Sequence, residues 1–188
     1  MDTREILLQT GLELFYRLSY EGVGVQEICG SAGVTKPSLY HHFGNKRGLL
    51  EAMVQSIAGD LQRGIRDCLP YRGDLPKTIS DFTAAVFRFA EKQPMQFRYF
   101  LSLRLSPPGS ISHEVVEELD RWMADQIQEV FLLAAEDHGN MRGRERLISA
   151  SFLGMLYAWG ILISENRVTI TDDFIHQAAH QFSHGIYS

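Results

Sequence analysis

The sequence predicts an all-α protein with an N-terminal three-helix domain and a larger helical body, about nine helices in total. Apolar residues recur at helical spacing along most of the 188 residues. No hairpin dipeptide lies between alternating apolar and polar residues, so β-strands are not expected. Proline and glycine interrupt the pattern at residues 70–74 and 107–109, where helices should end. We expect a domain boundary after residue 46, which gives domains 1–46 and 47–188.

Capping residues and prolines mark where the individual helices begin. Asp, Asn, Ser and Thr side chains can accept a hydrogen bond from the free amides of a first helical turn, and proline is tolerated there. A helix of residues 45–67 follows the first domain without an obvious linker, so it should bridge both parts of the chain. The expected helix starts outside residues 25–43 are Thr3, Asn45, Asp74, Pro94, Ser110 or Ser112, Arg144 and Asp172.

Charge is distributed unevenly along the chain. The formal net charge is −5, but residues 1–50 hold five basic and five acidic side chains, so the acidic excess lies in residues 51–188. Residues 22–50 hold three basic side chains and one acidic one, a local balance of +2. This weak positive region is compatible with nucleic acid, but tight binding would need two copies and directed contacts.

The two cysteines, Cys29 and Cys68, have no metal-ligand or disulfide spacing. The first residues carry mixed charge and lack the basic and apolar regions of a signal peptide. Both features lead us to expect a reducing, cytoplasmic location.

Residues 25–46 have the pattern of a helix-turn-helix followed by a further helix. Gly33 suits the turn because it adopts positive φ without a Cβ clash. Thr35 suits the N-cap of the second helix, and Pro37 suits its first turn. Leu39 and Phe43 are four residues apart and should face inward. A motif of this kind places its second helix in the DNA major groove.

The segment Gly33-Val-Thr-Lys-Pro-Ser-Leu-Tyr-His-His-Phe-Gly-Asn-Lys-Arg-Gly-Leu-Leu50 resembles the DNA-binding domain of the tetracycline-repressor (TetR) family. Leu7-Leu8, Leu14-Phe15 and Tyr20 fit the same pattern. The resemblance is specific over the first 50 residues, whereas the remaining 138 match only in length and helical character.

The resemblance and the residue types together define a predicted DNA-contacting set. Lys36 can donate to guanine or to phosphate, and the Gln26 amide suits adenine. The resemblance implies phosphate contacts for Tyr40 and His42 and places His41 nearer the bases. Lys46 would offer its charge and neighbouring helix-terminal amides to a phosphate. The complete set is Gln26, Thr35, Lys36, Pro37, Ser38, Tyr40, His41, His42 and Lys46.

Three departures from the family pattern involve four positions. Ser19 stands before Tyr20 where glycine is usual, which removes the residue best suited to positive φ. Val23-Gly24 stands where hydroxyl residues are usual, which removes a helix cap and a phosphate contact. Cys29 stands where alanine is usual, and a small buried thiol is the interpretation we favour over a redox switch.

The resemblance also implies that the body encloses an effector pocket lined by aromatic side chains. Arg104 lies one turn from Phe100 and could meet an anionic group there, although an ion pair with a surface carboxylate is the stronger alternative. The pocket candidates are Phe82, Phe100, Arg104, Trp122, Met123 and Tyr157.

Residues 147–164 contain no charged side chain, so their length reaches that of a membrane span. Their serines and glycines, and flanking Arg146 and Glu165, favour a helix buried on both sides in a soluble protein. The resemblance implies that the last two helices pair with a second copy as a four-helix bundle. The interface candidates are Ala150, Gly154, Ala158, Ile175, Ala179 and Phe182, and Ile186 should continue the apolar face of the last helix.

His176, His180 and His184 form one stripe of the last helix at four-residue spacing. Two histidines at this spacing can chelate a metal, but no nearby cysteine or carboxylate completes a site. We favour the rim of a subunit interface, where such histidines could make association depend on pH. No metal, cofactor or catalytic motif is predicted, because nucleophile, phosphate-loop and metalloprotease signatures are lacking.

We therefore expect a DNA-binding transcriptional regulator, a homodimeric repressor that a small hydrophobic or amphipathic effector releases from a near-palindromic double-stranded operator. No membrane association and no enzymatic activity are expected. Two alternatives stay open. One is a helix-turn-helix protein whose body binds a protein partner in an open apolar groove. The other is a helical enzyme that retains the motif as a structural element.

Overall fold

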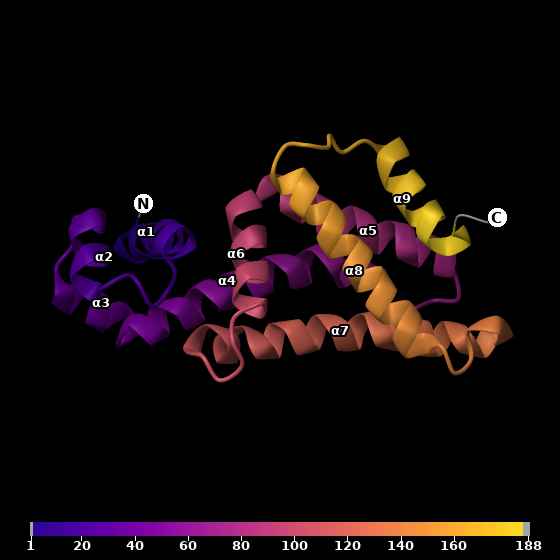
Figure 1. The fold of residues 1–188 in the computed structure, drawn as a ribbon, viewed down its shortest axis with the longest axis horizontal. Helices are drawn as coiled ribbons and strands as arrows, with labels where there is room; N and C mark the ends of the chain where they lie inside the picture. The colour runs from indigo at the N-terminus through magenta and orange to yellow at the C-terminus, as the bar shows by residue number, and fades with distance from the viewer. Residues whose placement is uncertain (1, 186–188) are drawn as a thin grey trace. The chain divides into compact units, whose positions relative to one another are not determined.

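The computed structural model describes residues 2–185, and this part of the chain forms nine α-helices and two short 3-10 helices without any strand (Figure 1). The predicted all-α class is therefore confirmed. Ile186, expected on the apolar face of the last helix, lies outside the described residues. The helices are α1 (Thr3–Leu18), α2 (Val25–Ala32), α3 (Lys36–Phe43), α4 (Lys46–Ile65), η1 (Arg66–Cys68), α5 (Leu75–Lys92), α6 (Pro94–Arg104), α7 (Ile111–Asp137), η2 (Gly139–Met141), α8 (Glu145–Ser164) and α9 (Asp172–His184).

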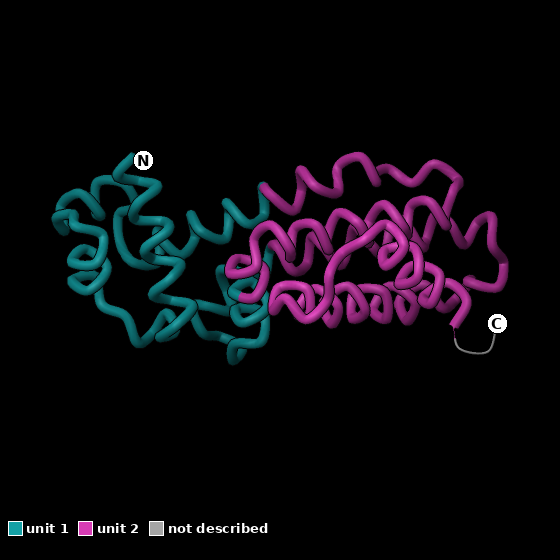
Figure 2. The backbone as a smooth tube through the Cα atoms, turned by 90° about the horizontal axis from the view of Figure 1, so that it is seen from above, with its two compact units in different colours: residues 1–59, 99–118 teal, residues 60–98, 119–188 magenta. Residues whose placement is uncertain are grey.

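The chain divides into two compact units, which differ from the two predicted domains (Figure 2). Unit 1 comprises residues 1–59 and 99–118, and unit 2 comprises residues 60–98 and 119–188. Helix α4 contributes residues to both units, as expected for a bridging helix. Sequence reasoning did not foresee that α6 and the start of α7 belong to the same unit as α1–α3. The boundary after residue 46, given as the end of the DNA-binding domain, remains a prediction.

Unit 1 is organised around a core that α1, α2, α3 and the first turns of α4 share. Leu7, Ile28, Leu39 and Leu49 are fully buried in it, at 0% exposure. Each comes from a different helix, so burial of their side chains holds the four helices together. The inward face predicted for α3 is confirmed at Leu39.

Unit 2 has an aromatic core. Helix α5 packs against both α8 and α9, and the Phe152 ring lies 5.8 Å from that of Phe131 and 4.8 Å from that of Phe182, between ring centroids. Phe82 meets Phe152 edge-on at 6.1 Å. These offset and edge-on arrangements are the favourable ones for aromatic rings. These rings therefore form part of the core of unit 2.

The capping residues agree with the sequence in most places. Asp74 accepts a hydrogen bond from the Lys77 amide at 3.0 Å, and the Asn45 side chain accepts one from the Gly48 amide at 2.9 Å. Asp2 rather than Thr3 is the N-cap of α1. Thr35 is the N-cap of α3, but its hydroxyl makes no capping hydrogen bond. The expected contribution of this hydroxyl is therefore wrong, although the expected position is right.

Helix α8 has one buried and one exposed face. Phe152, Leu156 and Gly160 are buried within the chain, whereas Leu147 and Ile161 are 63% and 38% exposed. Its length and composition would suffice to cross a membrane, yet 44% of its most apolar stretch is buried inside the protein. The expected burial on both sides is thus not achieved within one chain.

Ser19 occupies a backbone conformation that serine rarely adopts. It ends α1 with φ 66° and ψ 160°, a region accessible almost only to glycine. The Ser19 hydroxyl accepts a hydrogen bond of 3.3 Å from the Gly22 amide, which offsets part of the strain. The sequence argument that this position favours glycine is supported by this geometry.

Replacing Ser19 by glycine should therefore stabilise the protein. We expect Ser19→Gly to raise the free energy of unfolding by about 1 kcal/mol, because the strain at such a residue is about 1–3 kcal/mol and the hydroxyl contact is lost. Urea unfolding followed by circular dichroism measures the change. The control Ser19→Ala keeps the strain and loses the hydroxyl. An equal gain in both variants would show that backbone strain is not the cause.

Candidate nucleic-acid interface and body cavities

The helix-turn-helix is closed by backbone hydrogen bonds around Gly33. This residue ends α2 with φ 66°, as predicted. The Val34 amide donates to the Cys29 carbonyl at 3.0 Å, which caps the end of α2. Gly44 ends α3 with φ 74°, and its amide donates to the Tyr40 carbonyl at 2.8 Å. Two left-handed glycines therefore fix the beginning and end of the segment that carries α3.

Most of the predicted DNA-contacting residues lie on the exposed side of this motif. Tyr40 is 47% exposed, whereas the preceding residue, Leu39, is fully buried. The side chains of Ser38, His42 and Lys46 are half-buried. The remaining members are exposed: Gln26, Thr35, Lys36, Pro37 and His41. The surface is accessible to a duplex, and each individual DNA contact remains a prediction.

Two of these residues touch each other across the turn. The Lys36 ammonium donates a hydrogen bond of 3.4 Å to the Gln26 amide oxygen, so α2 and α3 present these two polar side chains together. The sequence also gave no reason to single out Arg4, whose guanidinium lies 5.6 Å from the centre of the Phe43 ring at the end of α3. Arg4 adds a positive charge beside the predicted set.

Lys46 has intramolecular partners that the sequence did not indicate. Its ammonium donates to the Tyr20 carbonyl at 2.8 Å and to the Val23 carbonyl at 3.0 Å. It also lies 4.1 Å from the centre of the Tyr20 ring. The Gly48 amide at the same helix start is already bound by Asn45. Lys46 therefore attaches the α1–α2 turn to α4, and its predicted phosphate contact would have to compete with these bonds.

The Val23-Gly24 departure has a clear structural form. Val23 is buried at 1% exposure, and Gly24 is the N-cap of α2 without a capping side chain. A Cβ atom at position 24 would meet nothing within 4 Å. The structure therefore has room for a hydroxyl side chain at position 24, and packing does not require glycine there. Cys29 is buried, in agreement with a structural thiol.

Helix α7 contributes polar contacts within unit 1. Arg47 pairs with Glu51 at 2.9 Å and with Glu114 of α7 at 3.1 Å. The Ser112 hydroxyl donates to Glu21 at 3.3 Å. Burial, and secondarily the nearby Glu21 carboxylate, raise the pKa of Tyr99. The start of α7 is thus attached both to α4 and to the turn after α1, through residues distant in sequence.

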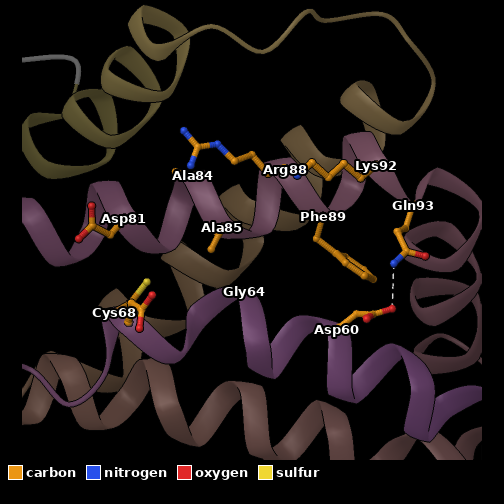
Figure 3. A pocket seen from close by; sticks show the side chains of 11 residues that line it. Asp60, Gly64, Cys68, Asp81, Ala84, Ala85, Arg88, Phe89, Lys92 and Gln93 are labelled. Atoms are coloured by element: carbon orange, nitrogen blue, oxygen red, sulfur yellow. Dashed lines mark hydrogen bonds between the residues drawn. The ribbon is translucent and has the colours of Figure 1, made fainter.

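A cavity of about 510 Å³ opens in unit 2 between α4, η1 and α5 (Figure 3). Phe89 points from α5 toward α4, and Gln93 donates to Asp60 at 2.8 Å at one end of the cavity. Cys68 lies at the other end, where burial raises the pKa of its thiol to about 11. The thiol is therefore protonated and weakly nucleophilic at neutral pH, which argues against a redox role for this cysteine.

The predicted pocket residues occupy different surroundings. Phe100 and Arg104 belong to unit 1, whereas Phe82, Trp122, Met123 and Tyr157 belong to unit 2. Phe82 lines a nearly filled cavity of about 10 Å³. Trp122 lines an open recess of about 510 Å³, together with Tyr71 and Leu133. A single effector pocket lined by all six residues remains a prediction.

The predicted dimer residues behave differently in α8 and α9. Ala150, Gly154 and Ala158 are all exposed on α8. Ile175 and Ala179 of α9 are buried inside their own chain, at 5% and 6% exposure, and Phe182 contacts Phe131 and Phe152. The apolar face of α9 therefore packs on its own body. An interface that includes α9 would use the opposite face of the helix.

The histidine stripe runs along the border of the apolar face, next to Ala179 and Phe182. His176, His180 and His184 are exposed, with ring centroids 5.9 Å and 4.2 Å apart in sequence order. Among residues 2–185, no three histidine, cysteine or acidic side chains are grouped closely enough to hold a metal ion. The stripe therefore offers ring nitrogens to a surface partner or to a ligand.

The fold and the exposed α3 define a helix-turn-helix DNA-binding protein. The family profile of bacterial regulatory proteins, tetR family, matches residues 7–53. The chain belongs to the TetR family of transcriptional regulators. Its homologues in this family are regulators rather than enzymes.

Individual relatives agree with this assignment. The chain is 26% identical over 152 residues to the uncharacterised HTH-type transcriptional regulator YezE of Bacillus subtilis, covering 77% of this chain and 76% of YezE. It is 29% identical over 122 residues to the transcriptional repressor DhaR of a Mycobacterium species, covering 64% and 61%. AibR, solved in complex with isovaleryl coenzyme A and operator DNA, has the same fold, with a TM-score of 0.73, 20% identity and coverage of 96% and 97%.

The Lys46 geometry leads to a prediction about stability. We expect Lys46→Met to lower the free energy of unfolding by about 1–3 kcal/mol, because two carbonyls lose a charged donor. The neighbouring Arg47→Met removes the same charge from an exposed ion pair and should cost less than about 1 kcal/mol. Urea unfolding of both variants gives the comparison. If Lys46→Met instead leaves the free energy of unfolding unchanged and lowers the salt dependence of DNA affinity by about one phosphate contact, Lys46 binds a phosphate as first predicted.

Proposed function

We propose that this protein is a cytoplasmic, homodimeric repressor that binds a near-palindromic operator and is released by a small hydrophobic or amphipathic effector. The observation that carries the proposal is the exposed face of α3, closed at both ends by left-handed glycines and backed by buried Leu39. A short, rigidly held helix with polar side chains outward is what major-groove binding requires.

DNA recognition in this proposal uses one α3 helix per subunit. Two subunits related by a twofold axis would place their α3 helices about 34–36 Å apart or slightly more, which corresponds to one helical turn of DNA. Lys36 and Gln26, which already touch, would read bases together. Tyr40 and His42 would bind phosphates. Two half-sites are needed because the positive charge of one subunit is small.

Dimerisation in this proposal uses the exposed face of α8. Leu147, Ala150, Gly154, Ala158 and Ile161 form an apolar stripe that is open to solvent in one chain. Small residues at four-residue spacing allow close approach of another helix, and a second copy supplies one with the same surface. The histidines of α9 would border this contact.

Effector control in this proposal rests on cavities in unit 2 and on the family assignment. Cavities of about 510 Å³ are large enough for a small molecule. AibR binds an acyl-coenzyme A and an operator, which shows both activities on this fold. An effector that couples to DNA binding by about 1–3 kcal/mol would weaken it about 5- to 150-fold. Helix α4, whose residues belong to both units, would transmit the change.

A second candidate function is supported by one open surface. The recess is lined by Trp122, Tyr71 and Leu133, and Leu133 is 37% exposed. An open recess with exposed aromatic and leucine side chains suits a helix of a protein partner. In this alternative the body would bind another protein in place of a small molecule.

In vitro selection from random duplexes, with the solution mass measured in parallel, tests the proposal. We expect a dimer that enriches one near-palindromic sequence, because twofold symmetry requires matching half-sites. A monomer that enriches a single half-site would contradict the homodimer. A folded dimer without any enrichment would contradict DNA recognition through α3.

Base reading by Lys36 and Gln26 can be tested on the selected operator. We expect Lys36→Ala to reduce the preference for the correct base pair about 5- to 150-fold, the range for one good base contact. Fluorescence anisotropy on the operator and on single-base variants measures this preference. The double variant with Gln26→Ala should lose less than the sum of the two single losses, because the side chains touch. Equal weakening on all duplexes would identify Lys36 as a phosphate contact instead.

Two glycines of α8 separate dimerisation from folding. A Cβ at Gly154 would meet nothing within 4 Å of its own chain, whereas one at Gly160 would lie 2.2 Å from the Phe97 ring. We expect Gly154→Arg to keep the wild-type helical circular dichroism spectrum, to shift the mass from dimer to monomer and to lose operator binding. Gly160→Ala should instead destabilise the fold. A dimeric Gly154→Arg protein would exclude this face of α8 as the interface.

A further inference from the structure

Unit 2 contains another cleft, of about 700 Å³, which we call the histidine cleft. It is lined by residues of the start of α5, the end of α7, η2, the start of α8 and the C-terminal half of α9. Its charged or titratable lining residues are His138, Arg144, His176, His180 and His184. None of the six residues predicted for the effector pocket lines it.

The floor of the histidine cleft is apolar. Ile79, Phe131 and Met141 line it and are buried at 4%, 1% and 8% exposure. Phe182 extends this surface toward the opening, and Leu147, at 63% exposure, lies at the rim that the cleft shares with the proposed α8 interface. Solvent-exposed apolar side chains around a concave surface favour a ligand with a hydrocarbon part.

The charge in the cleft has one sign. No aspartate or glutamate is among its lining residues, and Arg144 carries their one permanent charge. Arg144 forms no ion pair with any carboxylate in residues 2–185, so its guanidinium is available to an anion. The four histidines add ring N–H donors, and the close contact of 4.2 Å between His180 and His184 places two of them side by side.

We propose that the histidine cleft binds an organic anion with an aliphatic tail, which places a carboxylate against Arg144 and the histidines and the tail on the Phe131–Phe182 floor. A guanidinium and imidazole N–H groups suit a carboxylate, because charge-assisted hydrogen bonds are the strongest available to it. A cation would find no counter-charge in this lining. The site goes beyond the proposed function, since it needs neither α3 nor the predicted effector pocket.

Calorimetric titration of the full chain with sodium decanoate tests the site. Decanoate should bind, and decyltrimethylammonium, with an equally long tail and the opposite charge, should not. Shortening the acid to octanoate and hexanoate should weaken binding about two- to fourfold per methylene, because each buried methylene contributes up to about 0.8 kcal/mol. Binding of both head groups with equal affinity would overturn the proposal.

A pair of arginine variants locates the anion. Arg144→Gln should weaken decanoate binding about three- to tenfold, the range for a charged contact that is partly exposed. Arg146→Gln is the matched control, because Arg146 is an exposed neighbour that does not line the cleft. If both substitutions weaken decanoate binding equally, decanoate is attracted by the overall charge of the region and not by Arg144 in the cleft, which would overturn the proposal.

Histidine ring NMR signals separate this cleft from any other binding site. Decanoate should shift the signals of His138, His176, His180 and His184 and leave those of His41, His42 and His113 unchanged. If the signals of these four histidines shift when the protein is diluted but not when decanoate is added, a second copy of the chain occupies the cleft instead. Operator binding is measured separately by anisotropy, so loss of this site and failure of DNA recognition are distinguishable results.

Discussion

The bond between the Lys46 ammonium and the turn after α1 is the interaction on which the DNA-binding part depends. Two carbonyls, of Tyr20 and Val23, and the Tyr20 ring surround this one charge. The turn itself contains strained Ser19 and leads directly into α2 at Gly24, which has no side-chain cap. The residues of the turn therefore provide no side-chain cap for the start of α2. The hydrogen bonds from Lys46 at the start of α4 hold the turn in place instead. The orientation of α2, and through Gly33 that of α3, follows from this contact.

The sequence predicted the local features of the fold well, because each depends on one or two residue types. Left-handed Gly33 and the caps Asn45 and Asp74 are examples. It could not predict contacts between residues far apart in the chain, such as Arg47 with Glu114 or Lys46 with Val23. A basic residue at a helix start is equally compatible with a phosphate and with a carbonyl. Only the folded chain shows that a carbonyl is within reach, and the predicted DNA contacts share this ambiguity until a duplex is bound.

The two last helices show the same limit for apolar faces. Periodicity identified apolar stripes in both α8 and α9, but periodicity does not say which neighbour covers a stripe. In α9 the stripe of Ile175 and Ala179 is covered by the body of its own chain. In α8 the small-residue stripe at Gly154 stays open, while the opposite face closes on Phe97 at Gly160. The difference arises because α8 is apolar around most of its circumference and one chain can cover only part of it.

The distribution of charge implies that DNA binding depends on dimerisation if the protein forms the proposed dimer. Among residues 2–50, Lys46 is already bound to carbonyls and Arg47 to two carboxylates. Each neutralised phosphate contributes about 0.9 to the salt slope of DNA affinity, so a subunit with few available cations binds weakly at physiological salt. Two linked subunits double the number of such contacts and make the second half-site an intramolecular event. Opening the proposed α8 interface should therefore weaken operator binding by far more than the loss of any single cation on α3.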